Sequence, residues 1–225
     1  MKIRTYNELH EVLENEVGWR KTEIEYFSLQ IQNNQKETNK RFLRAATALL
    51  YAHWEGGIKG IAIAYLSFLN TKKVRYNDLN AGLLSTSLKS RFDKFAASGE
   101  IESHIEFARF LQGGEMEKNA SFATSLIDTG ANLNWKRFER ILVQLDIPAA
   151  PYRINQKHID RVLGWRNGIA HGEQFVSVDD TPLDAGTYKQ AEAVIVQMIE
   201  GLQADILNGV AMRNYLRIAA NDREN

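Results

Sequence analysis

The chain contains no cysteine, which excludes disulfide bonds, thiolate nucleophiles and cysteine-based zinc sites. Only three of its 225 residues are proline, so few positions interrupt a helix. The 28 basic and 28 acidic residues cancel, and a nucleic-acid partner would therefore need a local basic surface. Hydrophobic residues make up 44% and charged residues 25%, a composition typical of a globular protein with an ordinary core.

No segment offers the roughly 20 uninterrupted apolar residues that a membrane span requires. The most apolar stretch, residues 45–70, carries His53, Glu55 and Lys59 in its middle, where charges are unfavourable in lipid. We expect a buried core helix there. The N-terminal residues lack the apolar run of a signal peptide. We therefore expect a cytoplasmic protein with no membrane partner.

Nearly every segment repeats its apolar residues at the helical period, which predicts an all-α fold. The number and lengths of the helices indicate an up-and-down bundle with extra helices. We expect residues 1–225 to form a single domain, with a core at about 40–215 and an N-terminal helix over 5–32 packed on it. The remaining helices are expected at about 37–70, 80–97, 100–112, 135–145, 155–172 and 187–217.

Local signals place several ends of these helices. Thr5 and Glu8 have the spacing of a capping box, and Asn155 is an expected N-cap. Residues 32–35 form either a turn or an exposed section of helix, and residues 113–134 are expected to contain loops. The one strand-like segment is 175–178, followed by turn-forming residues.

One segment combines arginine, asparagine and histidine: Gly164-Trp165-Arg166-Asn167-Gly168-Ile169-Ala170-His171-Gly172-Glu173. Its three glycines recur every four residues and form a stripe that lets another backbone or a ligand approach closely. Asn167 and His171 share a helix face, while the Cβ of Arg166 points away from it. A guanidinium binds phosphate bidentately, and histidine transfers protons near neutral pH. This combination suits phosphodiester transfer.

Basic residues precede this segment. Arg153, Lys157 and Arg161 fall at four-residue steps, and residues 153–171 carry four basic side chains against one acid. An RNA backbone would favour such a stripe. Trp165 and Tyr152 could stack on bases, although Trp165 fits a core position equally well. The predicted RNA-binding residues are Arg153, Lys157, Arg161 and Trp165.

The pattern of Arg166, a polar residue, three further residues and His171 resembles the signature of HEPN domains. An arginine followed by a histidine at similar spacing also occurs at 4–10 and 153–158, but only 166–171 has asparagine after arginine and ends in His-Gly. The segment 51–56, Tyr-Ala-His-Trp-Glu-Gly, followed by Lys59, resembles the early helix of the MAE-type HEPN-like nucleases of prokaryotic toxin and antiphage systems. The two resemblances span about residues 40–215.

This resemblance implies a metal-independent endoribonuclease that needs no cofactor. The ribose 2′-OH would attack the adjacent phosphate and leave a 2′,3′-cyclic phosphate and a 5′-OH. His171 would transfer protons, Arg166 would stabilise the transition state and Asn167 would orient groups. Glu55 could support the site, although an i,i+4 pair with Lys59 is its simplest structural role.

The resemblance also implies partners: RNA, a second copy forming a homodimer with a composite active site, and a cognate antitoxin or regulatory protein. Two other functions stay open. One is a catalytically silent HEPN dimer that binds RNA or a nucleotide, and the other is a helical scaffold for protein interactions. His171 alone would also suit the C-terminus of a helix. The chain has no His-Glu-x-x-His motif, and we predict no metal site.

Overall fold

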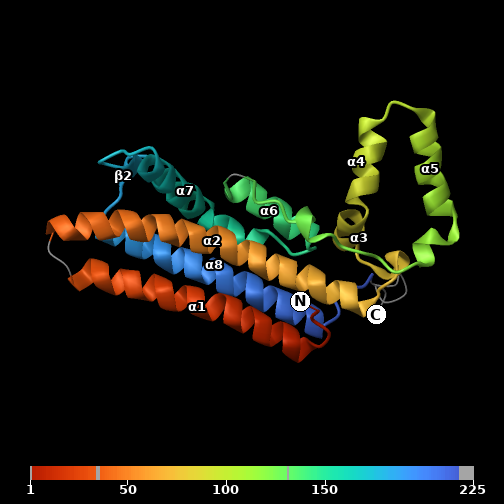
Figure 1. The fold of residues 1–225 in the computed structure, drawn as a ribbon, viewed down its shortest axis with the longest axis horizontal. Helices are drawn as coiled ribbons and strands as arrows, with labels where there is room; N and C mark the ends of the chain where they lie inside the picture. Colours follow the sequence, from red (N-terminus) through yellow and green to blue (C-terminus); the bar gives the residue numbers. More distant parts are fainter. Residues whose placement is uncertain (1, 34–35, 131, 218–225) are drawn as a thin grey trace.

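Three long helices form the centre of the fold: α1 (Tyr6–Asn33), α2 (Lys36–Lys72) and α8 (Ala185–Ala211). The computed structural model describes residues 2–33, 36–130 and 132–217, and these contain eight α-helices and one small hairpin. The three long helices lie side by side, with α2 and α8 running in one direction and α1 in the other (Figure 1). The predicted all-α fold is confirmed.

The first helix begins close to the predicted capping box. The hydroxyl of Thr5 accepts a hydrogen bond from the backbone N–H of Glu8 at 3.1 Å. The carboxylate of Glu8 accepts from the N–H of Arg4 at 2.7 Å, one residue before the expected partner. These bonds satisfy N–H groups that the first turn of a helix leaves without partners. Of the polar stretch at 32–35, Asn34 and Gln35 lie outside the described residues.

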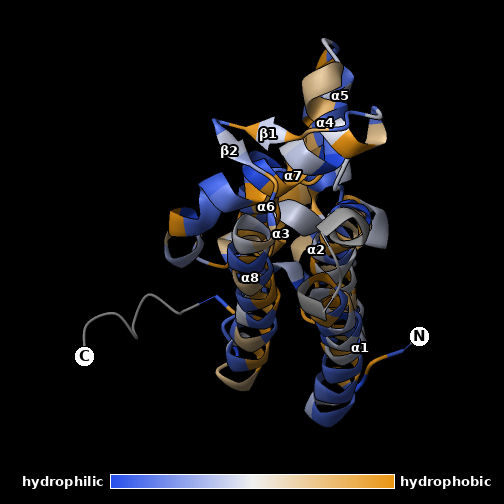
Figure 2. Ribbon diagram, turned by 90° about the vertical axis from the view of Figure 1, so that its left-hand side faces the viewer, coloured by the Kyte–Doolittle hydropathy of each residue, from blue (hydrophilic) through white to orange (hydrophobic). Residues whose placement is uncertain are grey.

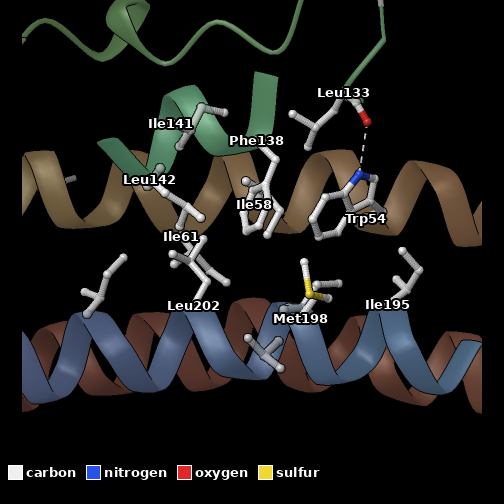
Figure 3. Close-up of a cluster of buried hydrophobic side chains, with 14 of the residues drawn as sticks. Trp54, Ile58, Ile61, Leu133, Phe138, Ile141, Leu142, Ile195, Met198 and Leu202 are labelled. Carbon is white, nitrogen blue, oxygen red and sulfur yellow. Dashed lines mark hydrogen bonds between the residues drawn. The ribbon is translucent and has the colours of Figure 1, made fainter. Parts of the chain in front are cut away.

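The core is centred on the middle of α2. Trp54, Ile58 and Ile61 are fully buried between α8 and a shorter helix, α6 (Trp135–Gln144) (Figure 3). Burying side chains of this size stabilises the fold by about 1.5–3 kcal/mol each. The indole N–H of Trp54 donates to the carbonyl of Leu133 at 3.1 Å, so the tryptophan also fixes the chain just before α6.

A helical arm projects from one end of the bundle (Figure 1). The expected helix at 80–97 is divided at Leu88, and the arm carries both hydrophobic and hydrophilic residues (Figure 2). Its helices are α3 (Ala81–Ser87), α4 (Lys89–Ala97) and α5 (Ile101–Gln112), and short 3-10 turns lie at Tyr76–Asp78, Gly114–Glu117 and Thr124–Leu126.

The helix that carries the Arg-Asn-His segment is α7 (Gln156–Ala170), which packs against α2 and α8. It follows a 3-10 turn at Ala150–Asn155. Asn155 occupies the predicted N-cap position, but its side chain makes no capping hydrogen bond, and its Nδ2 lies 3.3 Å from the sulfur of Met198.

A small hairpin, formed by β1 (Ser177–Val178) and β2 (Thr181–Pro182), follows α7 and packs against it. A Cβ on Gly164 would lie 2.6 Å from a methyl group of Val178, and one on Gly168 would lie 2.8 Å from the carboxylate of Glu173. Side chains of the same chain, those of Val178 and Glu173, therefore occupy the space beside these two glycines. The two residues between the strands both have positive φ, as in the type I′ turn that suits a two-residue hairpin.

The end of the last helix differs from the prediction. α8 begins with a capping box between Asp184 and Thr187 and ends at Ala211, so residues 212–217 are not helical. Arg213 has a φ of 57°, and the chain turns there so that the carbonyl of Tyr215 accepts from the N–H of Asn80. Pairing with a distant segment ends the helical conformation of this tail.

None of the helices in residues 2–33, 36–130 and 132–217 combines the length and apolarity of a membrane span.

Candidate functional site

A groove of about 470 Å³ lies between α2 and α7. On its α2 side, Tyr51, Glu55 and Lys59 recur every four residues and form one polar row. The adjacent row consists of small residues, so the floor beside the polar row is open. The complete lining comprises Ala48, Tyr51, Ala52, Glu55, Gly56, Lys59, Arg166, Ile169 and Ala170.

Arg166 is the cation that α7 contributes to this groove. Its guanidinium carbon lies 4.4 Å from the centre of the Tyr51 ring, within the range of a cation–π interaction. Its Nη1 donates to the Oδ1 of Asn167 at 2.9 Å. Within the part of the chain that the structure describes, Arg166 forms no ion pair with a carboxylate. The half-buried guanidinium therefore has most of its N–H donors left for an anion.

Tyr51 is held by its hydroxyl group. The backbone N–H of Leu133 donates to that oxygen at 2.6 Å. Burial, followed by the hydrogen bond with the Glu55 carboxylate, raises the pKa of Tyr51 well above its ordinary value, so the phenol stays neutral. Glu55 in turn accepts from the hydroxyl of Thr129 at 2.8 Å. A network of side chains thus joins the groove to the loop that precedes α6.

Glu55 does not have its predicted partner. Its carboxylate interacts with Tyr51 and Thr129, and no ion pair with Lys59 is found among the described residues. The expected i,i+4 pair is therefore wrong. The hydroxyl donors from α2 and the loop hold the Glu55 carboxylate, and the ammonium of Lys59 remains exposed at the end of the groove.

His171 lies at the C-terminal end of α7, where it is the capping residue. Its backbone N–H donates to the carbonyl of Asn167 at 2.9 Å, while its imidazole is exposed and is not part of the groove lining. The next residue, Gly172, has a φ of +82°, the left-handed conformation that commonly ends a helix. Arg44 of α2 donates to the carbonyl of Glu173 and so ties this turn to the groove wall.

The predicted basic stripe is only partly formed. Arg153 lies in the 3-10 turn before α7, and its guanidinium pairs with Glu139 of α6 at 2.6 Å. Lys157 is exposed on α7, and Arg161 is half-buried with its Nε buried and without a hydrogen-bond partner. The stripe does not continue at helical spacing through Arg153, because the backbone there is not α-helical.

The two aromatic side chains proposed for base stacking are core residues. Trp165 is 1% exposed, and its indole N–H donates to the carbonyl of Thr181 at 3.3 Å. The hydroxyl of the buried Tyr152 donates to the carboxylate of Asp205 at 2.5 Å. The prediction of Trp165 as an RNA-binding residue is therefore corrected: the hairpin folds over α7 and covers its indole.

Of the predicted set, the structure brings Arg166 and Glu55 to the lining of one groove, and Asn167 is in contact with the guanidinium of Arg166. Tyr51 was not among the predicted site residues. Its four-residue spacing from Glu55 and Lys59 could have indicated that the three side chains share one face of α2. Thr129 had no such signal, because its contact with Glu55 spans 74 residues of chain.

Comparison with known families identifies the family of this chain. Residues 9–215 match the family described as HEPN_MAE_28990:/-like HEPN, and the match covers most of the chain and most of α1. The chain belongs to this HEPN family. HEPN domains are generally associated with RNA binding and RNA cleavage. No curated protein and no solved structure matches the chain. Among the described residues, no group of three or more histidines and carboxylates is placed to hold a metal ion.

Proposed function

We propose that this protein is an endoribonuclease that cleaves RNA without a metal ion, and that Arg166, Asn167 and His171 are its catalytic residues. The observation that carries the proposal is the guanidinium of Arg166, which is held over an aromatic ring in a groove and is not paired with a carboxylate of the described residues. Such a group suits a phosphodiester, because guanidinium donors match two phosphate oxygens at once. Membership of the HEPN family supports the same chemistry.

In the proposed reaction the ribose 2′-oxygen attacks the adjacent phosphorus. The new bond joins the 2′-oxygen to phosphorus, and the bond from phosphorus to the 5′-oxygen breaks. The 2′-OH gives up its proton to a base, and the departing 5′-oxygen receives a proton. His171 performs proton transfer, since an imidazole changes its protonation state near neutral pH. Arg166 stabilises the charge that develops on the phosphate, and Asn167 orients the guanidinium.

The proposed enzyme works as a homodimer. The imidazole of His171 lies outside the groove lining of a single chain, so a second copy that brings its own His171 and Arg166 would complete a composite site. Lys157 and Arg161 lie on the same helix as the site and are proposed to contact the RNA backbone. Arg153 is proposed to do the same, and there the RNA phosphate would compete with Glu139 for the guanidinium. A cognate antitoxin or regulatory protein would restrain such a toxin or antiphage effector.

A silent RNA-binding or nucleotide-binding dimer is the second candidate. The exposed position of His171 favours it, because an imidazole that does not line the groove would leave an anion-binding site without a proton-transfer group. This candidate predicts RNA binding that persists after His171→Ala and depends on Arg166.

The deciding experiment incubates the purified protein with RNA and with DNA of the same sequence in EDTA. Wild type is compared with His171→Ala, Arg166→Ala and a control, His10→Ala, which removes an exposed histidine of α1. The proposal expects cleavage of RNA alone by wild type and the control, with 2′,3′-cyclic phosphate ends. Intact RNA that is nevertheless bound would favour the silent dimer. Equal cleavage by all four proteins would refute the proposed site.

A further inference from the structure

Tyr51 places an aromatic ring directly under the guanidinium of Arg166. The ring is 3% exposed, and its hydroxyl is held both by the N–H of Leu133 and by the carboxylate of Glu55. Because two partners hold the hydroxyl and the backbone of α2 holds the other end of the side chain, the ring is kept in place beside the groove. It therefore presents a fixed surface to a side chain that comes from a different helix.

A ring beneath a guanidinium leaves its hydrogen-bonding edge available. A cation–π contact uses the flat face of the guanidinium, whereas its N–H groups lie in the plane and point outward. One of the five N–H donors of Arg166 goes to Asn167 at 2.9 Å, and none is taken by a described carboxylate. The tyrosine ring and Asn167 thus fix the guanidinium at two points before any anion arrives.

We infer that Tyr51 is a positioning residue that holds Arg166 ready to bind a phosphodiester of RNA. This inference rests on the proposed function, since it takes RNA as the ligand of the groove. Tyr51 itself does not contact the phosphate. An arginine without this support would have to lose its side-chain freedom at the moment of binding, and the anion would be bound more weakly.

The test measures the affinity of the full chain for a fluorescent 2′-O-methyl oligoribonucleotide, which lacks the attacking hydroxyl and is not cleaved. Tyr51→Leu, which removes the ring, should weaken binding about fivefold to tenfold, and Arg166→Ala should weaken it at least as much. Tyr51→Phe, which restores the ring without the hydroxyl, should recover most of that loss. In the double variant Tyr51→Leu/Arg166→Ala, affinity should equal that of Arg166→Ala alone, because Tyr51 acts through Arg166.

Two results would overturn the inference. One is unchanged affinity in Tyr51→Leu, and the other is a further fivefold loss when Tyr51→Leu is added to Arg166→Ala. If the leucine variant does not fold, Tyr51→Met takes its place as a ring-free side chain of similar length. The NMR chemical shift of the Nε–H proton of Arg166 is a second measurement, and a purely structural role of Tyr51 would not change it. The shielding of this proton by the ring should be lost in the leucine variant and kept in the phenylalanine variant.

Failure of the inference and failure of the proposed function give different results. Wild type that binds the 2′-O-methyl probe through the Tyr51 and Arg166 pair, yet leaves unmodified RNA intact, refutes the nuclease and retains the inference. Wild type that cleaves unmodified RNA, with Tyr51→Leu unaltered in probe affinity, refutes the inference alone. If the wild-type protein has no affinity for the probe, the inference about Tyr51 is overturned.

Discussion

The burial of Trp165 predicts that substitutions there lower stability and leave RNA recognition unchanged. Trp165→Phe removes the hydrogen bond to the Thr181 carbonyl, a loss of about 1 kcal/mol. It also leaves a void on the order of 40 Å³, which adds about 1 kcal/mol at about 24 cal/mol per Å³. We expect the free energy of unfolding to fall by about 2 kcal/mol and Tm to fall by about 4–8 °C. Trp165→Ala should lower it by about 3–5 kcal/mol.

Urea denaturation followed by far-UV circular dichroism measures this change without relying on tryptophan fluorescence. The matched control is Trp19→Phe, the same chemical change at a side chain that is 50% exposed on α1. The control should change the free energy of unfolding by no more than about 0.5 kcal/mol. RNA affinity is measured below the denaturation range, where each variant is folded.

A loss of stability in Trp165→Phe as small as that in Trp19→Phe would show that the indole is not held beneath the hairpin. A loss of RNA affinity in Trp165→Phe, with the free energy of unfolding at the wild-type value, would show that the indole contacts RNA.

Three further changes should be visible in urea denaturation. Gly172→Ala should lower the free energy of unfolding by about 1 kcal/mol through backbone strain alone, because φ is +82° and a Cβ would meet no atom within 4 Å. Asp184→Ala should lower it by about 1 kcal/mol, since it removes the acceptor for the first turn of α8. Burial lowers the pKa of His53, against the opposing effect of Glu23, so the unfolded chain takes up a proton that the native imidazole resists. Stability should therefore fall as pH drops below about 6.5, by up to about 1.4 kcal/mol per pH unit, and His53→Gln should reduce this slope.

Each of these changes has a matched control. Gly114→Ala adds a methyl group in open space without a positive φ, and equal losses at Gly114 and Gly172 would contradict the strain argument. Asp184→Asn keeps an acceptor, so a loss as large as that of Asp184→Ala would contradict the capping argument. His10→Gln removes an exposed imidazole of α1 and should leave the pH slope unchanged. A wild-type slope in His53→Gln would show that another group carries the pH dependence.

Much of the helical framework was predictable because helix formation depends on neighbours within a few residues. The apolar period located α2 to within two residues at each end, and the bonds around Thr5 and Glu8 begin α1 close to where the motif indicated. The division at Leu88 and the end of α8 at Ala211 were missed. Residues 212–217 retain a helical pattern, but backbone pairing with the segment around Asn80 holds them in another conformation.

The candidate site shows the same division. The motif at 166–171 could be recognised in the sequence, because its residue types and spacing carry the resemblance to HEPN domains. The side of α7 on which Arg166 would find support could not be read there. Its partner ring comes from α2, and that ring is held by Leu133, which is 82 residues away along the chain.

The sequence by itself determined the all-α class, the positions of most helices and the segment proposed to carry the chemistry, because these follow from local periodicity and residue type. Only the tertiary structure decided that Trp165 is covered and that Glu55 interacts with Tyr51 and Thr129. It also decided that Arg166 faces a groove and, within the part of the chain that is described, has no acid paired to it. A helix has several faces of similar polarity, and the face that becomes buried is chosen by distant segments that pack against it.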